Sequence, residues 1–236
     1  MRALVRGVAE ENVTSGSRRV WAILRRQRHV LVSRKRVRRI MREEGLLREV
    51  HFPRPRLPAT GNQAAREPNR LWMADITYLD TTDRGPVGLL PVEDTCTREI
   101  LSWELLISCG AADAFRVLEA AVLARFPKTG RASGVTLKTD GGAQFTAHYF
   151  QDRARGLGLS LETRRKRRPE DGGIIESFNG HFKIDYIYTH EPTTYAETRL
   201  ACGEHIRQYN EERPHSSLDY LTPAAFYQSK LKEAKG

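Results

Sequence analysis

The sequence predicts an α/β domain with a mixed β-sheet, preceded by a small all-α segment. Three strand-like runs follow one another from residue 71, and helices and strands alternate after them, which is typical of α/β domains with a mixed sheet. The chain of 236 residues is 39% hydrophobic and 29% charged, which suits a globular domain with a sizeable core. Its positive charge lies at one end, because residues 1–70 hold 18 Lys and Arg against 6 acids and the remainder is nearly neutral.

Charge and composition narrow the possible functions. The net charge of +10 and its concentration in residues 1–70 favour an arm that binds nucleic acid; the alternative is a solvated basic surface. No apolar run is long enough to cross a bilayer, and the N-terminus lacks the apolar stretch of a signal peptide. We therefore expect no membrane partner and a cytoplasmic or nucleoid location. The three cysteines form no CxxC pair, so neither a disulfide framework nor a zinc finger is predicted.

Residues 1–50 are expected to form short helices. Ser17 is a candidate cap for a helix over residues 18–26, and Ser33 is a candidate cap for a second helix that Gly45 ends. One face of this second helix is apolar, with helical spacing of Val37, Ile40 and Met41.

The second helix exposes basic side chains, as a recognition helix does: Arg34, Lys35, Arg38 and Arg39. We interpret residues 1–50 as a helix-turn-helix-like DNA-binding segment in which most of these arginines contact phosphates. The alternative is an ordinary helical hairpin with a charged face. Residues 51–69 are expected to be a basic linker, because three prolines within residues 52–58 impose extended geometry there.

The pattern after the linker predicts the elements of the α/β domain. In chain order we expect strands over 71–79, 87–92 and 100–107, a helix over 111–126, a strand over 134–139, a helix over 146–155, a strand over 157–163, and helices over 172–188 and 194–213. The helix over 111–126 is expected to bury a face formed by Phe115, Leu118, Val122 and Leu123.

Three acids stand where an acid is costly unless it is used. Asp75 interrupts the strand over 71–79, Asp140 ends a strand just before two glycines, and Glu176 lies on the apolar side of its helix. Each has a structural alternative: a strand-end acid meeting an arginine, a plain turn, and a pair with Lys183. Three carboxylates in one cleft would repel each other, and a divalent ion relieves that repulsion; all-oxygen ligands suit Mg²⁺ or Mn²⁺.

The residues around these acids carry a family pattern. The first acid has the surroundings Trp72, Asp75 and Thr77; the second has Asp140, Gly142, Gln144 and Phe145; Glu176 follows after 35 intervening residues, with Lys183 seven positions farther on. Two later stretches, Tyr209–His215 and Leu221–Pro223, complete the pattern. In these motifs the chain resembles the DDE transposases of bacterial insertion sequences, of the second-reading-frame type, which are relatives of retroviral integrases.

The resemblance implies a ribonuclease-H-like core with a mixed five-stranded sheet flanked by helices, over residues 70–190, and a C-terminal helical extension over 191–236. It implies a polynucleotidyl transferase for DNA cleavage and strand transfer of a mobile element at the bacterial nucleoid. Asp75, Asp140 and Glu176 would hold two Mg²⁺ or Mn²⁺ ions. Asp94 is a second-ranked rival for the first acid.

The resemblance also implies partners. These are double-stranded DNA of the transposon ends and target, further copies of the chain on DNA, and a transposon protein from an upstream reading frame. Expected DNA contacts in the core are Lys183 and three residues of a basic run, Arg164, Arg165 and Lys166. The chain departs from the family at Gly172-Gly173, where an Asn usually precedes the Glu. Two other functions stay open: a structure-selective nuclease on the same fold, and a non-catalytic DNA-binding regulator from a transposon.

Overall fold

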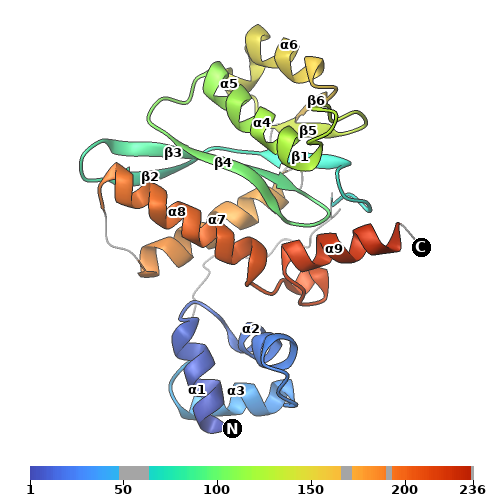
Figure 1. Ribbon diagram of the computed structural model, residues 1–236. Coiled ribbons are helices and arrows are strands. Elements are labelled where there is room, and N and C mark those ends of the chain that lie inside the picture. Colours follow the sequence, from blue (N-terminus) through green and yellow to red (C-terminus); the bar gives the residue numbers. More distant parts are fainter. Residues whose placement is uncertain (48–63, 166–171, 190–192, 235–236) are drawn as a thin grey trace.

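A computed structural model of the chain describes residues 1–47, 64–165, 172–189 and 193–234. It contains a small helical unit, a layered α/β domain and a C-terminal extension (Figure 1). The elements in chain order are α1 (Arg2–Glu11), α2 (Ser17–Ala22), the π-helical turn η1 (Ile23–Gln27), α3 (Arg34–Glu43), β1 (Leu71–Ala74), β2 (Thr77–Thr81), β3 (Gly85–Asp94), β4 (Ile100–Leu106), α4 (Ala111–Arg125), β5 (Thr136–Thr139), α5 (Ala143–Thr146), α6 (His148–Gly156), β6 (Ser160–Thr163), α7 (Gly173–Thr189), α8 (Tyr195–Glu211), the 3-10 turn η3 (Ser216–Leu218) and α9 (Pro223–Glu233).

The helical unit is formed by α1, α2 with η1, and α3 around a core of its own. Ser33 caps α3 as predicted, because its hydroxyl accepts a hydrogen bond from the backbone N–H of Arg36 at 3.3 Å. Ser17 is not a cap, since α2 begins at Ser17 and Gly16 precedes it. The buried residues of this core include the predicted face of α3: Val5, Val8, Ala9, Val20, Ile23, Leu24, Val37, Ile40 and Met41.

The sheet has six strands in five positions. β1 and β2 pair antiparallel with β3 in one continuous register, with Trp72 opposite Asp94 and Thr77 opposite Leu89. They therefore occupy a single position, and the strand predicted over 71–79 is divided in two. The order across the sheet is β4, β3, β1 with β2, β5 and β6, in which β1, β5 and β6 are parallel.

Helices cover both faces of the sheet. α4, α5 and α6 lie on one face, and α7 and α8 lie on the other (Figure 1). The alternation of strand residues supplies both cores, so Trp72 and Leu90 contact the α4 side whereas Met73 and Leu89 contact the α7 side. One predicted core residue is wrong: Leu123 of α4 is 52% exposed.

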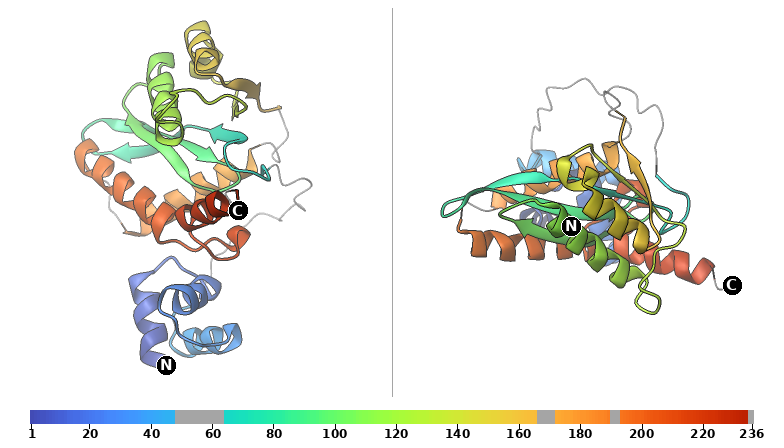
Figure 2. Two further views of the ribbon diagram at one scale, coloured as in Figure 1. Left: turned by 45° about the vertical axis from the view of Figure 1, so that its right-hand side comes forward. Right: turned by 90° about the horizontal axis from the view of Figure 1, so that it is seen from above.

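The helical unit packs against the C-terminal extension rather than the sheet. Figure 1 and the left view of Figure 2 place α1–α3 away from the strands, beyond α7 and α8. Arg26 Nη2 donates to the backbone oxygen of Asp219 at 2.9 Å and to its carboxylate at 2.8 Å, and Gln27 donates to the backbone oxygen of Glu212 at 2.7 Å. Among the described residues, no helix is both long enough and apolar enough to span a membrane.

Candidate active site

Asp75 lies in the break between β1 and β2. The continuous register of these strands places Asp75 opposite Pro91 of β3. A proline has no backbone N–H, so β3 cannot donate a ladder hydrogen bond at this point. The break leaves Asp75 at the edge of the ladder, with its side chain 17% exposed.

The parallel strands β1, β5 and β6 end side by side. Continuing their register by one or two residues places the residues that follow them in one row across the sheet: Asp75, Asp140 and Arg164. The backbone N–H of Arg164 donates to the oxygen of Thr139 at 2.8 Å, which extends the ladder to this row. Asp140 Oδ1 accepts from the N–H of Gly142 at 3.1 Å, so the chain turns directly after the second acid.

Arg164 joins two of the predicted acids. Its Nη2 donates to Asp75 Oδ1 at 2.8 Å, and its Nη1 donates to Glu176 Oε1 at 3.0 Å. Glu176 lies in the first turn of α7 with its side chain 51% exposed, so the prediction that it lies on the apolar side of the helix is wrong. Its neighbours Ile175 and Phe178 are buried against the sheet and leave Glu176 at the helix edge, within reach of Arg164.

Asp75 is the electrostatic centre of the site. Burial raises its pKa above the ordinary value, the Arg164 guanidinium opposes this rise, and the charges of Asp140 and Glu176 raise the pKa further. Asn179 of α7 also contacts this carboxylate, because its Nδ2 donates to Asp75 Oδ2 at 3.2 Å. Asp140 and Glu176 therefore both act on Asp75, although the three acids come from separate parts of the chain.

Gly172 makes room for Arg164. A Cβ at Gly172 would overlap with Nη1 of Arg164 and with Oε1 of Glu176. The departure from the family pattern at Gly172-Gly173 thus coincides with the space that the guanidinium fills.

The donor set suits a divalent cation. Three carboxylates offer the oxygen ligands that Mg²⁺ and Mn²⁺ prefer, and a cationic group already lies between two of them. Within the described residues, no three His, Cys, Asp or Glu side chains converge closely enough to hold a metal in the present arrangement. An ion shared by Asp75 and Glu176 would compete with the Arg164 guanidinium for their carboxylate oxygens.

The rival acid, Asp94, has a structural role. It is fully buried, and its carboxylate accepts hydrogen bonds from the backbone N–H groups of Asn69 at 2.7 Å, Cys96 at 2.8 Å and Thr97 at 3.3 Å. Burial raises the pKa of Asp94, and these backbone bonds oppose the rise. The carboxylate thus fixes the turn between β3 and β4.

The predicted DNA contacts lie in three places. Arg34, Lys35 and Arg38 line one pocket of the helical unit, whereas Arg39 is directed to Glu43, 3.7 Å away. Arg165 is exposed beside the acids, and Lys166 lies outside the described residues. Lys183 is half-buried on α7, seven residues beyond Glu176, which is about two helical turns.

Sequence reasoning missed two residues that shape the site and its support. Asn179 follows Glu176 by three positions, a helical spacing that could have indicated a shared direction. Asn210, within the predicted C-terminal motif, accepts from the N–H of Ile100 and donates to its oxygen, both at 2.9 Å. It thereby satisfies the backbone at the start of β4 and attaches α8 to the sheet.

Comparison with known proteins agrees with this arrangement. The Integrase core domain family matches residues 65–169, a second Integrase core domain profile matches residues 157–223, and the HTH-like domain family matches residues 1–54. These matches define the class as an integrase core with a helix-turn-helix-like domain.

A particular group of relatives matches nearly the whole chain. Transposase InsD for insertion element IS2A/D/F/H/I/K of Escherichia coli is 33% identical over 226 residues, which cover 93% of this chain and 75% of that protein. Transposase InsD for insertion element IS2-9 of Escherichia coli strain K12 is also 33% identical and matches over 93% and 74%. The chain belongs to this family of insertion-element transposases.

Two solved structures align with the chain. The simian T-cell lymphotropic virus intasome, determined in complex with PP2A regulatory subunit B56 gamma, aligns with a TM-score of 0.55 at 17% identity, over 93% of this chain and 74% of that one. The HTLV-2 integrase catalytic core domain in complex with magnesium aligns with a TM-score of 0.49 at 15% identity, over 68% and 97%. The intasome alignment, together with the match to the Integrase core domain family, confirms the expected ribonuclease-H-like, integrase-type architecture with a mixed sheet.

Proposed function

We propose that this transposase performs metal-dependent DNA strand cleavage and strand transfer, with Asp75, Asp140 and Glu176 as its catalytic residues. The observation that carries the proposal is the row at the ends of β1 and β5. It aligns Asp75 with Asp140, and Glu176 of α7 is joined to Asp75 through one guanidinium. Family membership supports polynucleotidyl transfer as the reaction class.

The three carboxylates would hold two Mg²⁺ or Mn²⁺ ions. When bound, such ions activate water or a 3′-hydroxyl and stabilise the leaving oxygen of an in-line displacement at phosphorus. The remaining work of the protein is positioning. Asn179 holds one oxygen of Asp75, the turn at Gly142 fixes Asp140, and Lys183 on α7 would add a positive charge near the scissile phosphate.

The substrate would be double-stranded DNA. The basic side chains of α3 that line one pocket support binding through the helical unit, and Arg165 and Lys166 would add contacts from the core. Further copies of the chain on DNA, and a transposon protein from an upstream reading frame, are part of the proposal on the strength of the family resemblance.

The test is cleavage and joining of labelled duplex DNA carrying the gene's own flanks, with and without Mg²⁺ or Mn²⁺. We expect Asp140→Asn and Glu176→Gln to abolish both reactions while DNA affinity is kept, and Asp152→Asn, an exposed acid of α6, to leave them unchanged. Metal-dependent cleavage that survives in Asp140→Asn would refute the assignment. Cleavage without joining or preference for the flanks would favour a structure-selective nuclease, and binding without cleavage in the wild type would favour a regulator.

A further inference from the structure

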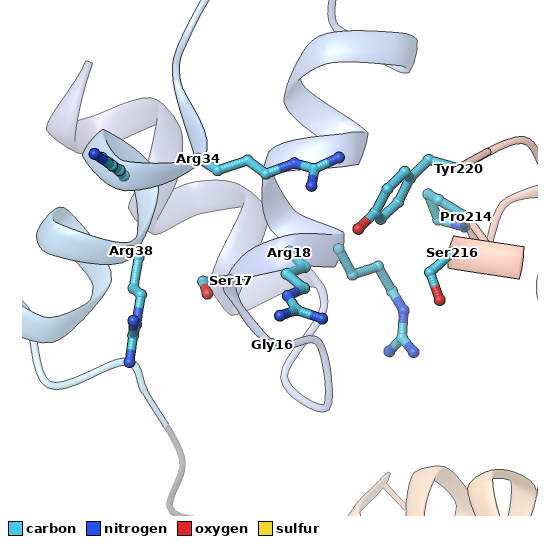
Figure 3. A pocket seen from close by; sticks show the side chains of 10 residues that line it. Gly16, Ser17, Arg18, Arg34, Arg38, Pro214, Ser216 and Tyr220 are labelled. Carbon is cyan, nitrogen blue, oxygen red and sulfur yellow. The ribbon is translucent and has the colours of Figure 1, made fainter. Parts of the chain in front are cut away.

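A basic pocket lies where the helical unit meets the C-terminal extension. Its volume is about 620 Å³, within the range of pockets that bind small ligands. One side carries the cations of α2 and α3, and the other carries Pro214, Ser216 and Tyr220 (Figure 3). Its five cationic side chains are Arg18, Arg19, Arg34, Lys35 and Arg38.

The five cations have no counter-charge within the part of the chain that the structure describes. Among the residues that the structure describes, none of them forms an ion pair with a carboxylate, although other arginines of the same unit do so. Arg2 and Arg6 pair with Glu43 and Glu44, and Arg28 pairs with Glu11. The pocket therefore gathers five cationic side chains that have no ion pair among the described residues, an arrangement that favours a polyanion.

The aromatic wall of the pocket is held in a fixed arrangement. The Arg34 guanidinium lies 4.2 Å from the ring centroid of Trp21 and 5.0 Å from that of Tyr220, and the two rings meet edge to face at 5.4 Å. Stacking on both rings orients Arg34 before any ligand arrives, so less freedom is lost on binding.

The turn that presents Tyr220 is strained. Asp219 and Tyr220 have φ of 49° and 59°, a left-handed conformation that costs energy for residues other than glycine. The turn is held by the bonds from Arg26 to Asp219 and by the N–H of Tyr220, which donates to the oxygen of His215 at 2.8 Å. Strain that is maintained by specific contacts next to a pocket indicates a functional turn.

We propose that this pocket binds a DNA strand, with phosphodiesters against the cations and a sugar or base against Tyr220, so that the C-terminal extension is part of the DNA-binding site. Five uncompensated charges exceed the charge of one phosphodiester, which favours several phosphates of one strand over a single small anion. An aromatic ring beside a basic groove is the usual combination for nucleic-acid strands. The inference rests on the proposed function, because that function supplies DNA as the ligand.

The test measures DNA binding by the full chain at several salt concentrations. Binding is monitored by the fluorescence anisotropy of a labelled duplex that carries the gene's flanks. Each phosphate contact adds about one to the slope of log K against log salt. We expect Arg18→Gln and Arg34→Gln each to lower that slope by about 1, and to weaken binding about tenfold. Tyr220→Ala, which removes no charge, is expected to weaken binding with little change in slope.

Matched controls are Arg36→Gln and Arg42→Gln, which remove the same charge from exposed sites on α3 that do not line the pocket. Arg34→Gln also removes the packing of Arg34 on two aromatic rings. Lys35→Gln therefore serves as a second pocket variant, which removes a charge without removing a stacked side chain. Equal losses in pocket and control variants would overturn the proposal. The proposal would also be overturned if inorganic pyrophosphate bound at micromolar concentration, and the pocket variants lost this binding but kept their DNA binding. That result would assign the pocket to a small polyphosphate.

The cleavage assay and the binding assay together distinguish failure of the proposed reaction from failure of the proposed pocket. A wild type that cleaves and joins flanking DNA, with pocket variants indistinguishable from the controls, would overturn only the pocket. A wild type that binds DNA through the pocket but has no metal-dependent cleavage would overturn the proposed reaction and support the pocket.

Discussion

Removing Arg164 should strengthen metal binding. Arg164→Gln takes away the guanidinium that a divalent ion would have to displace from Asp75 and Glu176. The bond to Asp75 dominates, because both side chains are largely buried, at 15% and 17% exposure. The bond to half-exposed Glu176 is screened by solvent and adds little.

The expected size follows from the strength of one charged hydrogen bond. Such a bond contributes roughly 1.5–3 kcal/mol, and 1.4 kcal/mol corresponds to about a factor of ten in affinity. We therefore expect Arg164→Gln to bind Mn²⁺ about tenfold to a hundredfold more tightly than the wild type. Gly172→Ala should act in the same direction with a smaller effect, because its Cβ would displace the guanidinium from Glu176 and leave Asp75 engaged.

The assay is isothermal titration with MnCl₂, supported by thermal unfolding at increasing Mn²⁺. Without metal, Arg164→Gln should unfold at a lower temperature than the wild type, because Asp75 loses its counter-charge; saturating Mn²⁺ should remove most of that difference. Arg165→Gln, an exposed neighbour, controls for the loss of one positive charge. Metal affinity that is unchanged or weaker in Arg164→Gln, with Arg165→Gln like the wild type, would refute the competition.

Two further predictions concern stability. Glu93 is fully buried, and burial raises its pKa from the ordinary 4.5 to about 8. The folded state therefore keeps a proton that the unfolded state loses, so stability should fall between pH 4.5 and about 8, by at most about 1.4 kcal/mol per pH unit. Glu93→Gln should remove this slope in urea unfolding, and parallel curves for the two proteins would contradict it; Glu162→Gln, an exposed acid of β6, is the control. Asn210→Ala should lower the free energy of unfolding by about 2 kcal/mol or more, because it leaves both backbone groups of Ile100 unpaired. Asn210→Asp keeps the acceptor and should lose less; equal stability of the wild type and Asn210→Ala would show that the bonds are not needed.

Much of the core could be predicted from local pattern. Strand and helix order after residue 71 followed from hydrophobic periodicity, and the motif residues around Asp75 and Asp140 selected two acids whose strands prove to be parallel neighbours. The break at Asp75 could not be predicted locally, because it depends on Pro91, a residue sixteen positions away that meets Asp75 only through the antiparallel register.

The position of Arg164 illustrates a second limit. In the sequence it is the first residue of a basic run, and the side chains of such a run are expected to contact solvent or DNA. Its contact with two acids results from the register between β5 and β6 and from the space that Gly172 leaves. Neither feature can be predicted from the local sequence. The exposure of Glu176 also depends on the fold, because α7 packs on the sheet through Ile175 and Phe178 and leaves Glu176 at the edge of the helix.

The contact between Arg26 and Asp219 joins residues 193 positions apart. During translation, the basic helices leave the ribosome long before Tyr220 is synthesised. A nascent or prematurely terminated chain would thus carry the positive charge but not the complete pocket. If the pocket binds a DNA strand as proposed, such chains would adhere to DNA without holding a strand in place, and secure binding would begin only once Asp219 and Tyr220 have been made.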